Sequence, residues 1–267
     1  MPSSGRNLPA AIGVGIGLAG LLVASLAWRP EPFVVFAAVV VVLAMRELAI
    51  ALAHARVDLP FWPLAVGGVG IQICAYQAGL TGALVGLVVT VVAGLVWRAI
   101  DGLGPAFTRD ATATVFAAVY IGLLPAFLVL IAVIPGEGHW LALAVLFLPV
   151  ANDTGGYILG TLAGRHKLAP SISPKKSWEG LAGSVILTSA AGVLAVVLLG
   201  HSWWLGLVLA CVAVATSTLG DLAESLLKRD LGVKDMGSLL PGHGGVLDRV
   251  DSMLMTAPVA FTVLAAL

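Results

Sequence analysis

Long runs of apolar residues dominate this sequence and restrict what it can fold into. Nine such runs, separated by short polar or glycine-containing stretches, lie at about 8–28, 32–53, 61–79, 80–99, 111–133, 139–162, 179–200, 203–227 and 252–267. A bilayer core about 30 Å thick needs roughly 20 apolar residues per helix. The runs therefore predict about nine transmembrane helices, with the shortest connection at 79–82.

The small number of charged side chains excludes an ordinary soluble domain. Charged residues make up 10% of the 267 residues, against about 25% in globular proteins, and the mean hydropathy is +1.05. The predicted fold class is an all-α polytopic membrane protein. We expect one integral membrane unit, with helices 1–4 in residues 1–110 and helices 5–9, which carry the candidate functional site, in residues 111–267. The net charge of zero gives no support for a nucleic-acid partner.

The positions of the cations predict the orientation of these helices. With a cytoplasmic N-terminus, thirteen of the fourteen Lys and Arg residues fall on the inner side and only Arg29 falls outside, as the positive-inside rule requires. Nine spans then place the C-terminus outside. The first run exceeds the apolar region of a signal peptide, about 7–15 residues, so we expect a retained helix. The expected location is the plasma or inner membrane, with the candidate functional site facing the cytoplasm.

Charge is concentrated in two segments that both face the cytoplasm in this topology. Residues 153–179 hold six charged side chains and residues 221–251 hold ten, out of 28 in the chain. Asp153 lies inside an apolar run, where a carboxylate normally faces a polar interior and marks function. A structural hydrogen bond between helices is the alternative for Asp153. The same run carries Gly156, Gly160 and Gly164 at a spacing that lets two helix backbones approach closely.

The first segment ends in a cationic loop that leads into a new helix. Lys175 and Lys176 precede Ser177 at the predicted helix start. Helix N-termini bind anions through their free N–H groups, so we predict a phosphate site here. The alternative is that both lysines only set the topology or bind anionic headgroups nonspecifically.

The second segment begins with a polar stripe on the eighth run. Ser217, Asp221, Ser225 and Lys228 follow one another at steps of four, four and three residues, which places them on one helix face. The stripe therefore leads toward the charged end of that helix.

The loop after this stripe has the composition of an anion and metal site. Gly244 and Gly245 follow His243 and allow tight turns whose N–H groups face a ligand. Asp248 and Asp251 share a face if a helix begins there, and carboxylate oxygens suit Mg²⁺. Asp251 is either a further ligand or a partner of Arg249.

At these residues the sequence resembles a known family, the phosphatidate cytidylyltransferases or CDP-diacylglycerol synthases. The resemblance is to that family's 27-residue signature, which reads in this chain Ser225-x2-Lys228-Arg229-x4-Lys234-Asp235-x-Gly237-x2-Leu240-Pro241-x-His243-Gly244-Gly245-Val246-x-Asp248-Arg249-Val250-Asp251. Asp153-Thr154-Gly155 and the run from Ile172 to Gly180 are similar to that family's second motif. These motifs cover about 60 residues of the C-terminal half, and residues 1–150 match only in being multi-helical.

The resemblance implies the reaction CTP + phosphatidate → CDP-diacylglycerol + pyrophosphate at the cytoplasmic face of the membrane. It implies a homodimer that depends on Mg²⁺, with K⁺ as an accompanying cation, and metal ligands that correspond to Asp221 and Asp248. The residues given catalytic roles are Asp221, Asp248, Lys228, Arg229 and His243. The substrate-binding set is Asp153, Lys175, Lys176, Ser177, Ser217, Ser225, Lys234, Gly244, Gly245 and Arg249. His243 is assigned to phosphate positioning rather than proton transfer, because a phosphate monoester with a second pKa of about 6 is already ionised.

A transporter is the main alternative from another functional class, because intramembrane Asp153 and Asp221 suit proton or ion relays. A transporter predicts charge spread through the membrane depth and two related halves. The charge here clusters at one face and no internal repeat is found. These observations favour the enzyme.

Overall fold

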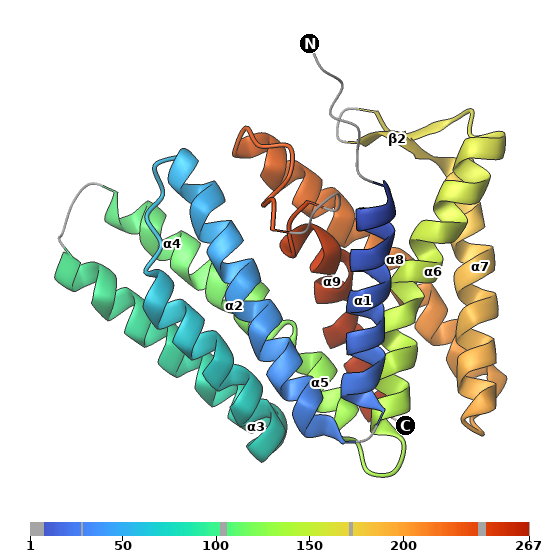
Figure 1. Cartoon of the computed structure of the whole chain (residues 1–267), viewed down its shortest axis with the longest axis horizontal. Helices are drawn as coiled ribbons and strands as arrows, with labels where there is room; N and C mark the ends of the chain where they lie inside the picture. Colours follow the sequence, from blue (N-terminus) through green and yellow to red (C-terminus); the bar gives the residue numbers. More distant parts are fainter. Residues whose placement is uncertain (1–7, 28, 102–105, 171–172, 240–243, 267) are drawn as a thin grey trace. The chain divides into compact units, whose positions relative to one another are not determined.

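The computed structural model describes residues 8–27, 29–101, 106–170, 173–239 and 244–266, which are almost entirely helical (Figure 1). The helices are α1 Leu8–Leu26, α2 Pro30–His54, α3 Phe61–Asp101, α4 Phe107–Ala117, α5 Ala126–Ala132, α6 Gly138–Ala163, α7 Trp178–Leu198, α8 Trp203–Asp230 and α9 Leu247–Ala265. A π-helical turn, η1 Ala118–Leu123, joins α4 to the segment that leads into α5. Two short strands, β1 Lys167–Ala169 and β2 Ser173–Ser177, form an antiparallel hairpin.

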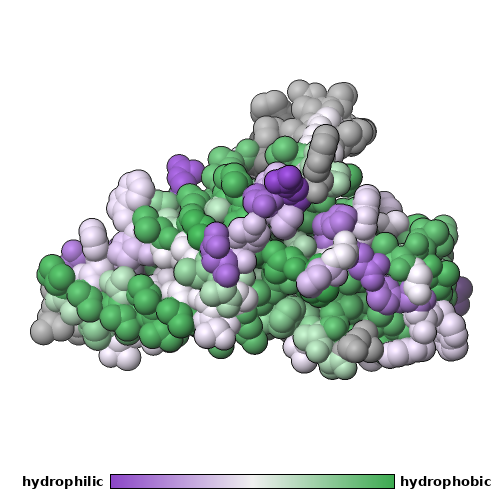
Figure 2. All heavy atoms as spheres, turned by 90° about the horizontal axis from the view of Figure 1, so that it is seen from below, coloured by the Kyte–Doolittle hydropathy of each residue, from purple (hydrophilic) through white to green (hydrophobic). Residues whose placement is uncertain are grey.

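Six helical segments of the described residues are long and apolar enough to cross a membrane. They are Pro30–His54, Phe61–Asp101, Phe107–Ala132, Gly138–Ala163, Trp178–Leu198 and Trp203–Asp230. Apolar side chains also cover much of the molecular face in Figure 2. The prediction of a polytopic helical membrane protein is confirmed, with the β1–β2 hairpin as an unpredicted exception to an all-α chain. The count of nine spans and the placement of the two termini stay predictions.

Helix α3 contains the break expected between the third and fourth apolar runs. Ala78 and Gly79 have non-helical backbone angles, and Gly79 has a φ of 60°, a region that glycine enters without steric cost. The two halves of α3 then pack against each other, because a Cβ on Gly82 would lie 2.2 Å from the carbonyl oxygen of Cys74. The 41 residues of α3 therefore form two helical halves joined at this break.

The contacts divide the chain into two compact units. The first contains residues 1–129 and 228–250, and the second contains residues 130–227 and 251–267. In the first unit, α2 packs on α3, and η1 contacts both helices. In the second, α6 and α7 lie side by side with the hairpin at one end (Figure 1). The subdivision expected near residue 110 stays a prediction.

Close approach of α6 and α7 depends on glycines from both helices. A Cβ on Gly155 would lie 2.3 Å from the carbonyl oxygen of Gly183, and a Cβ on Gly183 would lie 2.3 Å from that of Gly155. Gly160 faces the Cα of Gly180, as the predicted glycine face of α6 requires. The backbones are thus in direct contact, which fixes where the polar residues of α6 lie.

The hairpin is held onto the start of α7 by two side chains. Ser177 is the N-cap of α7, and its Oγ accepts the N–H of Gly180 at 3.1 Å, a common way to satisfy a free amide at a helix start. Glu179 accepts the backbone N–H of Arg165 at 3.1 Å and contacts Nδ1 of His166 at 2.6 Å. The helix start predicted at Ser177 is confirmed.

The α6–α7 contact predicts a strong effect from a single methyl group. Gly183→Ala places its Cβ against a backbone oxygen that cannot move alone, so we expect a cost of about 1–3 kcal/mol from overpacking. The control is Gly70→Ala on α3, where a Cβ meets nothing within 4 Å and alanine gains about 1 kcal/mol of helix propensity. Thermal unfolding in detergent should show a lower midpoint for Gly183→Ala alone. Equal midpoints for both variants would contradict the close packing.

Candidate active site

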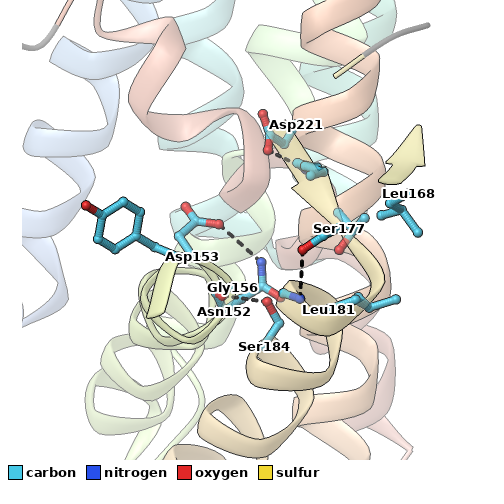
Figure 3. Close-up of a pocket in the computed structure, with 12 residues that line it drawn as sticks. Asn152, Asp153, Gly156, Leu168, Ser177, Leu181, Ser184 and Asp221 are labelled. Carbon is cyan, nitrogen blue, oxygen red and sulfur yellow. Dashed lines mark hydrogen bonds and ion pairs between the residues drawn. The ribbon is translucent and has the colours of Figure 1, made fainter. Parts of the chain in front are cut away.

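A pocket in the second unit brings together polar side chains from α6, the hairpin, α7 and α8 (Figure 3). The pocket has a volume of about 260 Å³. Its lining residues are Asn152, Asp153, Gly156, Tyr157, Leu168, Lys176, Ser177, Gly180, Leu181, Ser184, Thr218 and Asp221. Four predicted site residues, Asp153, Lys176, Ser177 and Asp221, thus lie around one hollow.

The carboxylate of Asp221 forms an ion pair with the ammonium of Lys176. The two side chains are 36% and 26% exposed, respectively, so both remain accessible from the pocket. Asp221 comes from α8 and Lys176 from strand β2, so the pair connects a membrane-spanning helix to the hairpin. A cationic group already lies beside the carboxylate that was predicted to bind a metal ion.

Asp153 enters the pocket from α6 and is positioned by its neighbour Asn152. The Nδ2 of Asn152 donates to Oδ1 of Asp153 at 3.1 Å (Figure 3). Asn152 is itself buried, and its backbone carbonyl accepts the Oγ–H of Ser184 from α7 at 2.7 Å. The α6–α7 contact therefore determines where the Asp153 carboxylate lies.

Some pocket residues were not predicted from the sequence. Thr218 lines the pocket, whereas its predicted neighbour Ser217 is 1% exposed and lies 3.2 Å from Oγ1 of Thr256 on α9. Residues three and four positions before Asp221 both lie near its helix face, so the periodicity could not choose between them. Ser225 lies one turn beyond Asp221 and is partly exposed. Ser177 lines the pocket, but its Oγ already caps α7.

The carboxylate of Asp248 binds groups of the loop between α8 and α9, residues 231–246, which we call the signature loop. This loop belongs to the first unit. Its Oδ1 accepts a hydrogen bond from Nζ of Lys228 at 2.9 Å, and its Oδ2 accepts the backbone N–H groups of Met236 at 3.0 Å and Gly245 at 2.8 Å. The side chain is only 4% exposed. Burial raises the pKa of Asp248, but these hydrogen bonds and the charge of Lys228 outweigh it, so the pKa is lowered. Asp248 is therefore held as an anion.

The two predicted loop glycines have different structural reasons to be glycine. Gly244 has a φ of 86°, where other residues are strained. The N–H of Gly245, expected to face a ligand, donates to Asp248 in this structure. Gly245 thus helps to fix the metal-ligand candidate itself.

The other predicted site residues differ in their exposure to solvent. Arg229, Lys234 and Arg249 are exposed, whereas Asp251 is 8% exposed and accepts the N–H of Ser252 at 2.7 Å. His243 lies outside the described residues, as does the side chain of Lys175, whose backbone is part of β2.

The pocket has the ligand chemistry that Mg²⁺ takes in nucleotide-binding proteins. Within the described part of the chain, no three His, Cys, Asp or Glu side chains come together. Mg²⁺ commonly uses only one or two carboxylates and leaves its other positions to water and substrate phosphates. Asp153 and Asp221 line one hollow and fit that pattern.

Comparison with known proteins identifies the family. The model of the cytidylyltransferase family matches residues 9–267. A phosphatidate cytidylyltransferase of Mycobacterium leprae (strain TN) is 43% identical over 282 residues, which cover 100% of this chain and 90% of that protein. One of Mycobacterium tuberculosis (strain ATCC 25618 / H37Rv) is 39% identical over 99% of this chain and 84% of its own length.

A further relative matches over a shorter region. A phosphatidate cytidylyltransferase of Haemophilus influenzae is 45% identical over 130 residues, or 46% of this chain and 45% of that protein. Together with the match along nearly the whole length, these similarities show that this chain belongs to the cytidylyltransferase family.

Proposed function

We propose that this chain is a nucleotidyltransferase of phospholipid biosynthesis that converts CTP and phosphatidate into CDP-diacylglycerol and pyrophosphate. The observation that carries the proposal is its similarity, at 39–43% identity over full length, to proteins named phosphatidate cytidylyltransferase. The apolar helices agree with a substrate that resides in a bilayer.

The reaction requires two polyanions to be brought together. An oxygen of the phosphatidate phosphate attacks the α-phosphorus of CTP. The bond from that phosphorus to the oxygen that bridges it to the β-phosphorus breaks, and this oxygen leaves as a terminal oxygen of pyrophosphate. With a second pKa of about 6, the phosphate nucleophile is already largely ionised at neutral pH. The protein therefore needs no general base, and its residues act by positioning the substrates and neutralising charge.

The pocket of the second unit supplies groups for both tasks. In the proposal, Asp221 and Asp153 would hold Mg²⁺, which would supply positive charge against the CTP phosphates and the leaving group. Lys176 already neutralises Asp221 and can exchange that carboxylate for phosphate oxygens, with which an ammonium forms charge-assisted hydrogen bonds.

The signature loop of the first unit supplies further cations. In the proposal, Lys228 and the exposed Arg229, Lys234 and Arg249 donate to phosphate oxygens. We also propose Asp248 of this unit as a metal ligand and, separately, Asp251 of the second unit. Asp248 carries the negative charge that a metal ligand needs, and a metal ion bound there would replace one of its present donors, Lys228 or the amides of Met236 and Gly245.

The membrane arrangement is part of the same proposal. The distribution of Lys and Arg along the sequence supports a cytoplasmic N-terminus and an active site at the cytoplasmic face of the cell membrane. We further propose a homodimer in which K⁺ accompanies Mg²⁺, as the family resemblance implies.

The proposed activity predicts pyrophosphate release by the purified protein in detergent. Release should require CTP, phosphatidate and Mg²⁺ together, and omission of any one should reduce it to background. The measurement is a coupled pyrophosphate assay, with diacylglycerol replacing phosphatidate as a control that lacks the nucleophile. Absence of release at every Mg²⁺ concentration would overturn the proposed function.

The metal role predicts that Asp221→Asn nearly abolishes turnover, by about 100-fold or more, because a charge-stabilising group is lost. The matched control is Asp230→Asn, an exposed position at the end of the same helix. Turnover should be measured across a Mg²⁺ titration, and thermal unfolding should show that both variants are folded. If Asp221→Asn retained most of its Mg²⁺-dependent activity, its carboxylate would hold no metal.

A further inference from the structure

Glu47 is a buried carboxylate on the apolar face of α2, and the signature motifs do not include it. Glu47 is 4% exposed, and the nearby residues Met45 and Leu48 are also buried. A carboxylate at such a position costs free energy unless it is bonded. The position therefore needs an explanation other than core packing.

Glu47 contacts the end of the signature loop and the start of α9, 200 positions along the chain. Oε2 of Glu47 accepts the backbone N–H of Leu247 at 2.9 Å. Leu247 is the first residue of α9, and amides at a helix start have no acceptor within the helix. Both residues belong to the first unit.

Two signature glycines make space for the same carboxylate. A Cβ on Gly237 would lie 2.3 Å from Oε1 of Glu47, and one on Gly245 would lie 2.5 Å from Oε2. The three atoms nearest to the added Cβ of Gly237 all belong to Glu47. Glycine at these two positions therefore accommodates the Glu47 side chain.

The loop is consequently held by two carboxylates. Asp248 accepts the N–H groups of Met236 and Gly245, and Glu47 contacts Gly237, Gly245 and the amide of Leu247. Oε1 of Glu47 is buried and accepts no hydrogen bond from the described residues. A buried acceptor without a partner lowers stability, so the fold retains this side chain despite that cost.

We propose that Glu47 is a positioning residue for the cytidylyl transfer, acting through the loop that carries Lys234 and Asp248 without touching the substrates. The inference rests on the proposed function. A residue needed only for core packing would be replaced without loss by an apolar side chain of similar size. A positioning residue requires its hydrogen-bonding oxygen and the space that Gly237 leaves.

The first test separates positioning from packing. Glu47→Leu keeps an apolar core but leaves the Leu247 amide without its acceptor, so we expect at least a tenfold fall in kcat/KM for CTP with a near-unchanged thermal midpoint. We also expect faster trypsin cleavage after the exposed Lys234. Glu47→Gln retains an acceptor oxygen and should recover most of the activity. The control is Glu31→Leu, an exposed position in the first turn of α2.

The second test uses the contact with Gly237. Gly237→Ala should reduce kcat/KM at least tenfold in the wild-type background but less than threefold in a Glu47→Ala background, where the clash is gone. Equal effects in both backgrounds, or full activity of Glu47→Leu, would overturn the proposal. If the wild-type protein released no pyrophosphate, the proposed function would fail. Trypsin cleavage of the same variants would still test the Glu47 contact.

Discussion

The arrangement of the signature loop depends on the hydrogen bonds that converge on the Asp248 carboxylate. Nζ of Lys228 and the amides of Met236 and Gly245 all donate to it, so one anion fixes the end of α8, the loop and the start of α9. Glu47 reinforces the arrangement from α2 through the Leu247 amide. The cationic side chains that we propose to contact phosphates are thereby carried on a backbone that two buried acidic side chains hold in place.

In the second unit, close packing of two helices positions the polar side chains. Gly155 and Gly183 let α6 and α7 touch along their backbones, which brings the polar groups at the start of α7 beside Asp153. Lys176 then reaches Asp221 from the hairpin. An ammonium beside a carboxylate lowers the cost of a charge in apolar surroundings, and both side chains remain partly exposed in the pocket.

Much of this could be predicted from the sequence because the relevant signals are local. Apolar runs predict the helices, Gly79 marks the break in α3, and charged residues in apolar surroundings predict Asp153 and Asp221. Contacts between distant segments could not be predicted in this way. Helical periodicity selected Ser217 where the pocket uses Thr218, and no spacing rule connects α2 to a loop 200 positions away. The short hairpin strands also lack a distinctive apolar alternation.

The central claim is that phosphatidate attacks the α-phosphorus of CTP, and labelled CTP tests it most directly. Purified protein should be given phosphatidate and Mg²⁺ with CTP labelled either at the α-phosphorus or at the γ-phosphorus. Attack at the α-phosphorus predicts that the α-label moves into the lipid fraction and that the γ-label leaves as pyrophosphate. Transfer of the γ-label to lipid, or retention of both labels in CTP, would contradict the account.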